Sequence, residues 1–266
     1  MKNTGKRERV RSTQTQQVPD NLIWGRRAAL EVLRHDKSRV QQAYLQSGAK
    51  FDAELHQALK VVSSTEMDRE QMELITAGQN HQGVCLVLEP RKSLTLDELA
   101  GLSLSETGNK LLVVLDQVVD PHNFGAVLRA AETSGVDGVI ITKNHSAGLT
   151  PTVRKVSAGA SELVPVVDVN NLQRTFELLK AKGFWVAGLC LPDLAQGIDA
   201  KCLYQTELPS PLVIVLGAEG SGLRQLTRSS CDLLVEIPMR GKLQSLNVSQ
   251  AAAAVLFEVM RQRNYS

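Results

Sequence analysis

The sequence has few of the features that mark secreted, metal-binding or membrane proteins. Its four cysteines stand far apart without a C-x-x-C pair, and none of its five histidines forms an H-x-x-x-H pair. We therefore expect reduced, mostly buried thiols and no metal site. No segment reaches the ~18 consecutive apolar residues that a membrane-spanning helix needs. The first segment is basic but lacks the apolar stretch of a signal peptide, so a cytoplasmic protein is expected.

A strong excess of charge is also lacking. The formal net charge is +2, from 30 Lys and Arg against 28 Asp and Glu. A polyanionic partner is recognised by clustered positive charge, so this total neither indicates nor excludes nucleic acid. Within residues 1–20, positions 1–19 hold five basic residues against the single acid Glu8 and show no apolar period. They predict a disordered basic arm, which is either a solubilising tail or a source of salt-sensitive phosphate contacts.

Residues 21–90 predict a small α/β domain. Apolar residues that recur with a period of about 3.6 residues indicate helices at 26–33, 52–59 and 69–76. Runs of strand-forming residues indicate strands at 40–45, 61–62 and 84–88. Between 91 and 109 the apolar signal weakens, which predicts a linker with room for one short helix.

Residues 110–266 predict a larger α/β domain. Continuous apolar strands at 111–115, 139–142, 163–167, 185–189, 212–216 and 233–237 alternate with helical stretches, and a terminal helix is expected at 249–263. Strands without polar alternation are typical of a parallel sheet covered on both faces. In such sheets, ligands bind beyond the carboxyl ends of the strands, and three of the loops there are distinctive.

The first loop follows 111–115 and leads into a helix through Asp120, Pro121 and Asn123. Asn123 is a plausible N-cap for that helix. Arg129 stands among Ala, Val and Leu residues, where an unpaired guanidinium would be costly to bury. It is therefore either a solvated helix charge or a group with an anionic partner, from protein or RNA.

The second loop, Gly-Ala-Glu-Gly-Ser-Gly at 217–222, lies between a strand and a helix expected from about Leu223. Glycines at such a junction allow close backbone approach to a ligand, or simply form a tight turn. The spacing is G-x-x-G-x-G and not G-x-G-x-x-G, which disfavours a nicotinamide cofactor.

The third loop, 238–249, places Ser245, Asn247 and Ser249 before the terminal helix. One of them suffices as a helix cap. The surplus of hydroxyl and amide groups suggests a polar ligand, such as a ribose or a methionine carboxylate.

Together, the segments N-F-G-A-V-L-R-A-A-E, L-G-A-E-G-S-G-L and I-P-M-R-G-K-L-Q-S-L-N-V-S resemble the three signature motifs of the SpoU/TrmH family (SPOUT superfamily) of RNA ribose methyltransferases. The resemblance covers about 111–263, and 21–90 resembles the family's ribosomal-protein-like substrate-binding domain. Within the family, the chain looks most like bacterial enzymes that methylate a guanosine of 23S rRNA.

The resemblance implies an S-adenosylmethionine-dependent enzyme with a deep trefoil knot, which general topology rules would not predict. It also implies a homodimer with its active site near the subunit interface. The implied reactive residues are Asn123, Arg129, Glu219, Ser245 and Asn247. The implied cofactor-binding residues are Leu189, Leu216, Gly217, Gly220, Ile237, Met239 and Leu246.

A guanidinium stays protonated, so we expect Arg129 to stabilise the developing alkoxide or to hold a phosphate rather than to act as a base. For RNA contact outside the pocket we expect a set of basic residues, each of which is alternatively a solvated surface charge. They are Arg26, Arg27, Arg154, Lys155, Arg240 and Lys242. Two other functions stay open, a transfer-RNA ribose methyltransferase and a non-catalytic RNA-binding ribosome-assembly factor.

Overall fold

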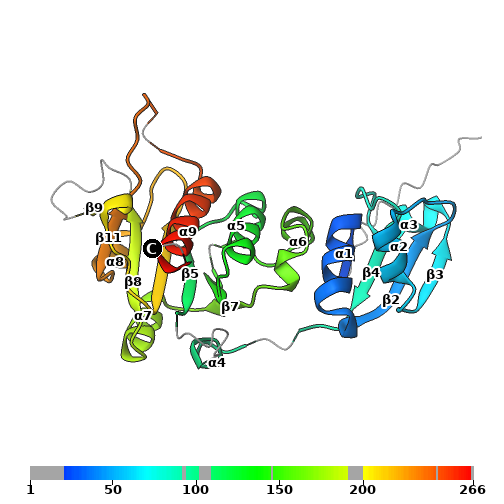
Figure 1. The fold of residues 1–266 in the computed structure, drawn as a ribbon, viewed down its shortest axis with the longest axis horizontal. Helices are drawn as coiled ribbons and strands as arrows, with labels where there is room; N and C mark the ends of the chain where they lie inside the picture. The colour runs from blue at the N-terminus through cyan, green and yellow to red at the C-terminus, as the bar shows by residue number, and fades with distance from the viewer. Residues whose placement is uncertain are drawn as a thin grey trace, which may run out of the picture.

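The computed structural model describes residues 21–91, 94–101, 109–144, 146–190, 200–243 and 245–264. The predicted basic arm lies outside these residues. Figure 1 shows two α/β units next to each other, each built on a sheet of its own.

The first unit is a four-stranded sheet of order β1-β4-β2-β3, in which only the β2–β3 pair is parallel. Side chains of β4 alternate between its two faces. Leu86 packs with α1 and α2, whereas Cys85 packs with Met72 of α3. In chain order the elements are β1 (Leu22–Trp24), α1 (Arg26–His35), β2 (Val40–Gln46), α2 (Ala53–Leu59), β3 (Ser64–Met67), α3 (Arg69–Ile75) and β4 (Val84–Leu88).

The expected short helix of the connecting segment is α4 (Leu96–Gly101). Thr95 and Glu98 form a reciprocal cap at its start: the Thr95 N–H donates to Glu98 Oε2 at 2.8 Å, and the Glu98 N–H donates to Thr95 Oγ1 at 3.2 Å. Leu99 is buried against the second unit, so α4 is part of that unit's core.

The second unit is a seven-stranded sheet of order β7-β6-β5-β10-β8-β11-β9, in which every pair is parallel. This confirms the predicted parallel α/β architecture. Its elements are β5 (Leu111–Asp116), α5 (Pro121–Thr133), β6 (Gly138–Thr142), α6 (Pro151–Val156), β7 (Val166–Val169), α7 (Leu172–Ala181), β8 (Trp185–Cys190), β9 (Ala200–Cys202), β10 (Leu212–Gly217), α8 (Gln225–Ser229), β11 (Leu233–Glu236) and α9 (Val248–Asn264).

Both faces of this sheet are covered. Val113 packs into a cluster with α5, α6 and α9, while its neighbours Leu112 and Val114 pack into a second cluster with α4 and α7. Every residue of β5 is buried, which explains why its sequence is apolar without alternation.

Three expectations about local structure differ from the observed structure, and two short strands were missed. Residues 61–62 form no strand, because they follow the end of α2 and Val61 is 63% exposed. The predicted strand 163–167 starts only at Val166, after a 3-10 turn and Pro165. The helix expected from Leu223 starts at Gln225. The short strands β1 and β9 were not expected at all.

Candidate active site

Asp120, not Asn123, caps α5. The Asp120 carboxylate accepts a hydrogen bond from the backbone N–H of His122 at 2.9 Å, and Pro121 occupies the first helical position. This bond, followed by that from the Asn123 amide, lowers the pKa of Asp120. Asn123 therefore lies within the first turn, buried, with its side chain available for other contacts.

Asn123 joins the three distinctive loops. Its Nδ2 donates to Asp120 Oδ2 at 3.1 Å and to Glu219 Oε1, and its Oδ1 accepts from Asn247 Nδ2 at 2.9 Å. Glu219 follows β10 and Asn247 precedes α9, so the carboxyl ends of β5, β10 and β11 meet at one amide. Side chains from all three distinctive loops are therefore in contact through Asn123.

Asn247 also caps α9. Its Oδ1 accepts from the backbone N–H of Ser249 at 2.8 Å and from the Ser249 hydroxyl at 2.6 Å, and its carbonyl accepts from Ala251 N at 2.9 Å. This fixes the direction of its amide nitrogen toward Asn123. Ser245 is exposed, and its side chain makes no hydrogen bond with any residue of the described segments.

The glycine turn 218–222 closes tightly on β10. Ala218 and Gly222 exchange two backbone hydrogen bonds of 3.1 and 2.9 Å, and Gly220 and Gly222 have φ of +79° and +65°. A Cβ on Gly217 would lie 2.2 Å from the backbone carbon of Gly222. Position 217 therefore requires glycine, because a side chain there would collide with the backbone of the same loop where it turns back. A Cβ on Gly220 would meet open space.

Beneath this turn lies a pocket with mainly apolar walls. It is lined by all seven residues expected to bind a cofactor and by Glu219 and Ser245. Five lining residues were missed, namely Cys190, Ala218, Gly222, Val248 and Ala251. Their positions in the chain could have identified them. Cys190 ends β8, Ala218 and Gly222 belong to the glycine turn, and Val248 and Ala251 lie in the first turn of α9.

The Cys190 thiol in this pocket is buried. Burial, foremost, raises its pKa, which favours the protonated thiol at neutral pH.

Arg129 is in the first of the two states left open by its sequence, that of a solvated helix charge. Its side chain is exposed on α5, and it forms no ion pair or hydrogen bond within the described segments. The helix turns it outward, so no desolvation cost has to be offset inside the chain. Any anionic partner has to come from another molecule or from outside the described residues.

An ion pair with one buried partner lies behind the site and was not expected from the sequence. Asp116, the last residue of β5, is fully buried and lies 2.7 Å from Arg224 Nη2, at the start of α8. This pair holds the segment after the glycine turn against the end of β5. It positions the loops and does not line the pocket.

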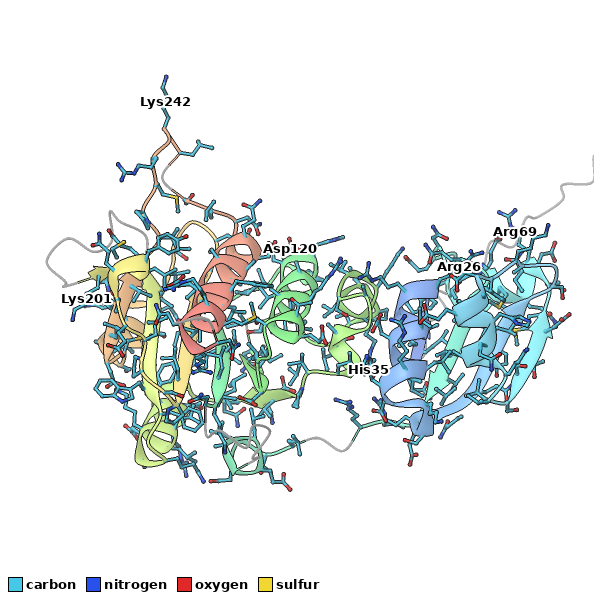
Figure 2. All side chains as sticks on the ribbon, in the orientation of Figure 1. Arg26, His35, Arg69, Asp120, Lys201 and Lys242 are labelled. Atoms are coloured by element: carbon cyan, nitrogen blue, oxygen red, sulfur yellow. The ribbon has the colours of Figure 1, made fainter. Side chains whose placement is uncertain are left out.

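The six expected RNA-contact residues fall into different surroundings. Arg26, Arg27, Lys155, Arg240 and Lys242 are exposed. Arg154 is instead largely buried and paired with Glu162. Figure 2 shows Lys242 at the tip of the extended loop that follows β11. It lies on the same long edge of the molecule as Asp120, Arg26 and Arg69.

Within the described segments, His, Cys, Asp and Glu side chains form no group of three or more that could hold a metal ion. No helix there is long and apolar enough to cross a membrane.

Comparison with known proteins covers both units. Residues 110–257 match the model of the SpoU rRNA Methylase family, and residues 22–94 match that of the RNA 2'-O ribose methyltransferase substrate-binding domain. The 23S rRNA (guanosine-2'-O-)-methyltransferase RlmB of Vibrio cholerae is 43% identical over 250 residues, which are 92% of this chain and 98% of the relative.

Solved structures share the fold. The SpoU methyltransferase AviRb from Streptomyces viridochromogenes, in complex with AdoMet, superposes with a TM-score of 0.72 at 24% identity, over 92% of this chain and 91% of that one. The A. aeolicus TrmH/SpoU tRNA modifying enzyme superposes with a TM-score of 0.52 at 27% identity, over 63% of this chain and 82% of that one. On the family match and the full-length identity, the chain belongs to the SpoU rRNA methylase family.

Proposed function

We propose that the protein transfers a methyl group from S-adenosylmethionine to the ribose 2'-hydroxyl of a guanosine in 23S rRNA. The observation that carries the proposal is the meeting of three strand-end loops at Asn123, directly above a pocket lined by the family's cofactor positions. The relative from Vibrio cholerae, which bears that activity in its name, matches both units of the chain.

The pocket suits S-adenosylmethionine. Leu189, Leu216, Ile237 and Met239 offer apolar surface to an adenine ring, and the turn at Gly217 to Gly222 offers backbone donors and acceptors to its edges. The residues that would hold the cofactor are Leu189, Leu216, Gly217, Gly220, Ile237, Met239 and Leu246. When bound, the cofactor supplies an electrophilic methyl group on a sulfonium centre.

The polar rim would orient the ribose. Asn123 and Glu219 hold each other in place, and Asn247 is fixed by the cap of α9, so none needs to reorganise when the sugar arrives. Ser245 is the rim group without an internal partner in the described segments, and it would bond the sugar directly. Arg129 would stabilise the alkoxide that develops as the hydroxyl loses its proton, or hold the neighbouring phosphate.

We also propose a homodimer, with Arg129 close to the second subunit. Phe257 on α9 is 42% exposed and Leu243 on the extended loop after β11 is 83% exposed, which leaves apolar surface for a second copy. We further propose that the second unit forms the deep trefoil knot that the family resemblance implies. In this proposal, residues 21–90 bind the substrate RNA, residues 91–109 link the two domains, and residues 110–266 form the methyltransferase domain. The enzyme would act in the cytoplasm.

Transfer RNA is the second candidate substrate, because the A. aeolicus enzyme is named for it. That match spans 63% of this chain, whereas the rRNA relative spans 92%. The match to the rRNA relative extends over the first unit as well, which favours 23S rRNA as the substrate. Methyl transfer to purified transfer RNA and to 23S rRNA in parallel decides between them.

Calorimetric titration with S-adenosylmethionine tests the proposal against a purely RNA-binding role. Saturable binding of one cofactor per chain is expected, and its absence would exclude the enzyme. The rate of methyl transfer by Arg129→Lys, measured against pH, tests the role of Arg129. A near-normal rate with an unchanged profile would argue against both of its proposed tasks.

A further inference from the structure

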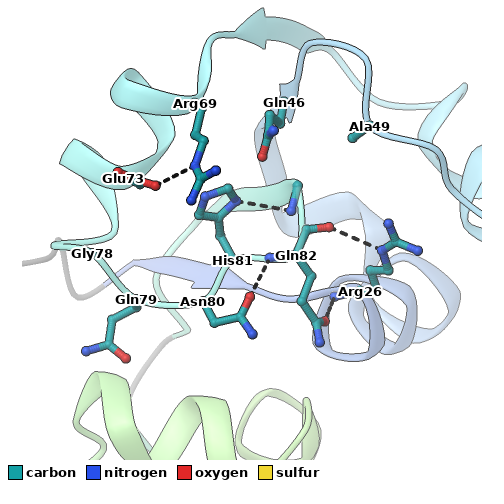
Figure 3. A pocket seen from close by; sticks show the side chains of 11 residues that line it. Arg26, Gln46, Ala49, Arg69, Glu73, Gly78, Gln79, Asn80, His81 and Gln82 are labelled. Atoms are coloured by element: carbon teal, nitrogen blue, oxygen red, sulfur yellow. Dashed lines mark hydrogen bonds and ion pairs between the residues drawn. The ribbon is translucent and has the colours of Figure 1, made fainter.

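A polar hollow, open to solvent, lies in the first unit. Its volume is about 750 Å³, within the range of sites that hold small ligands. Figure 3 shows side chains that enter it from α1, α3 and the loop before β4, with α6 of the second unit below. The lining residues are Arg26, Gln46, Ala49, Arg69, Glu73, Gly78, Gln79, Asn80, His81, Gln82 and Gly83.

Two arginines and the single carboxylate of Glu73 give the hollow a net positive charge. Arg69 Nε donates to Glu73 Oε1 at 2.7 Å, and Arg26 Nε donates to the carbonyl of Gln82 at 3.2 Å while its guanidinium lies over the ring of Phe51. These contacts orient both guanidinium groups, and the Arg69 side chain remains 78% exposed. Their terminal nitrogens have no partner within the described segments, and such nitrogens are matched to phosphate oxygens.

The amide side chains of the lining present donors. Gln82 Oε1 accepts from Arg26 N at 2.9 Å, Asn80 Oδ1 accepts from Gln82 N at 3.3 Å, and Gln79 Oε1 accepts from Lys155 Nζ at 3.4 Å. The oxygens are thus occupied, while the three amide nitrogens have no partner within the described segments. A fitting ligand must offer acceptors.

His81 adds a further donor. Its Nδ1 accepts from the Gly83 N–H at 3.1 Å, and burial, foremost, lowers its pKa. The ring is therefore neutral at pH 7, with its hydrogen on Nε2.

The loop that carries these groups is held in an unusual conformation. Ala77 and Gln82 have φ of +47° and +54°, although neither is glycine. Such backbone persists where the surroundings fix it, and it is frequent at binding sites. Gln82 is fixed here by its two contacts with Arg26.

We propose that this hollow binds one unpaired nucleotide of the RNA substrate, with Arg26 and Arg69 at its phosphate and the amides of Gln79, Asn80 and Gln82 at acceptor atoms of its base. The inference rests on the proposed function, since it presumes that RNA is the substrate. A base offers its Watson–Crick edge to the amides only when it is unpaired, because pairing occupies that edge. Arg26 and Arg69 lie on the same long edge as Asp120 and Lys242, so one RNA can extend from this hollow to the catalytic pocket (Figure 2).

The test compares Arg69→Ala and Asn80→Ala with the matched control Lys60→Ala, which removes an exposed charge of the same unit outside the hollow. Fluorescence anisotropy measures binding of single-stranded oligouridylate and of an RNA duplex of equal length, at several salt concentrations. Circular dichroism checks that each variant is folded.

For the single strand, Arg69→Ala is expected to lose about tenfold in affinity and to reduce the slope of log K against log salt by about 0.7. Asn80→Ala is expected to lose affinity with an unchanged slope, because it removes no charge. Lys60→Ala binds like the unchanged protein. Binding of both hollow variants equal to that of Lys60→Ala overturns the proposal, as does an equal loss for the duplex.

The outcome is separable from that of the proposed function. Cofactor binding and methyl transfer by the unchanged protein test the enzyme alone. A protein that methylates 23S rRNA, but whose hollow variants bind single strands normally, is an enzyme without this nucleotide site.

Discussion

Asn123 and Asn247 stand 124 positions apart, and the Asn247 Nδ2 donates to the Asn123 Oδ1 at 2.9 Å. The same Asn123 side chain donates to Glu219 through its nitrogen. One amide therefore uses both of its ends to hold the loops after β5, β10 and β11 in register. Because Asn123 itself does not line the cofactor pocket, its loss should affect the reaction more than cofactor binding.

Asn123→Ala should lower the rate of methyl transfer by about 10² to 10³, the usual cost of removing one preorganised polar group from an active site. The affinity for S-adenosylmethionine should change little. Asn144→Ala is the control, because it removes an exposed amide at the end of β6 that lies outside the pocket. Equal rates in the two variants would contradict the role of Asn123.

Gly217→Ala should be more damaging than Gly220→Ala, although only Gly220 has a positive φ. An alanine Cβ at 217 would lie within 2.4 Å of backbone atoms of Gly222 and Leu223, so the turn must open, at a cost of more than about 3 kcal/mol. At 220 the cost is about 1 kcal/mol of backbone strain. Thermal unfolding and cofactor titration of both variants measure the difference, and the reverse order would be inconsistent with the geometry of the turn.

Arg224→Ala should destabilise the fold by about 3 kcal/mol, whereas Asp116→Asn should cost about 1 kcal/mol. The difference follows from burial: Asp116 is fully buried and would be left as an uncompensated charge, while the half-exposed Arg224 can turn to water. Urea unfolding of the two variants provides the comparison. Equal losses would mean that the ion pair does not hold these loops together.

Glu162 should anchor the two units to each other. Its carboxylate, 2% exposed as a residue, accepts from Arg39 of the first unit at 3.1 Å and pairs with Arg154 of α6. Glu162→Ala leaves two mostly buried arginines facing each other, which should cost about 3 to 5 kcal/mol and loosen the contact between the units. Small-angle scattering should show a larger radius of gyration than for Glu132→Ala, an exposed carboxylate of α5. An unchanged radius would count against this anchor.

The thiols of the buried Cys85 and of the partly buried Cys231 should resist chemical modification. Burial raises the pKa of Cys85 and of Cys231 to about 12, so both remain protonated at pH 8 and should react slowly with thiol reagents until the chain unfolds. Because the unfolded thiols ionise at lower pH than the folded ones, their contribution to stability is complete below about pH 9 and is lost as the pH rises further. Mass spectrometry of labelled peptides and unfolding at pH 8 and pH 10 measure both effects. Rapid labelling of Cys85 in the folded protein would contradict the burial.

The strands of the second unit were predictable from sequence to within a residue or two, except β7 and β9, because burial on both faces leaves an uninterrupted apolar run. Pro165 shifted the start of β7, and β9 is too short to show a pattern. The loops that carry the site were predictable for the same reason, since they follow recognisable strands.

Other features depend on spatial neighbours and could not be predicted from the sequence. The cap of α5 is an exception, because a proline favours the first helical position, and Pro121 therefore assigns the cap to Asp120 rather than to Asn123. Arg129 stands among apolar residues in sequence, yet the helix turns it outward. The ion pairs Asp116–Arg224 and Glu162–Arg39 join residues more than 100 positions apart, for which a single sequence carries no local signal.

The most direct test of the whole account is nucleoside mass spectrometry of 23S rRNA from a strain that lacks this gene, after incubation with the purified protein and S-adenosylmethionine. The account predicts a single guanosine that gains a methyl group on its ribose, and loss of that product with Asn123→Ala. A methyl group on the base, or no methylated nucleoside at all, would contradict it.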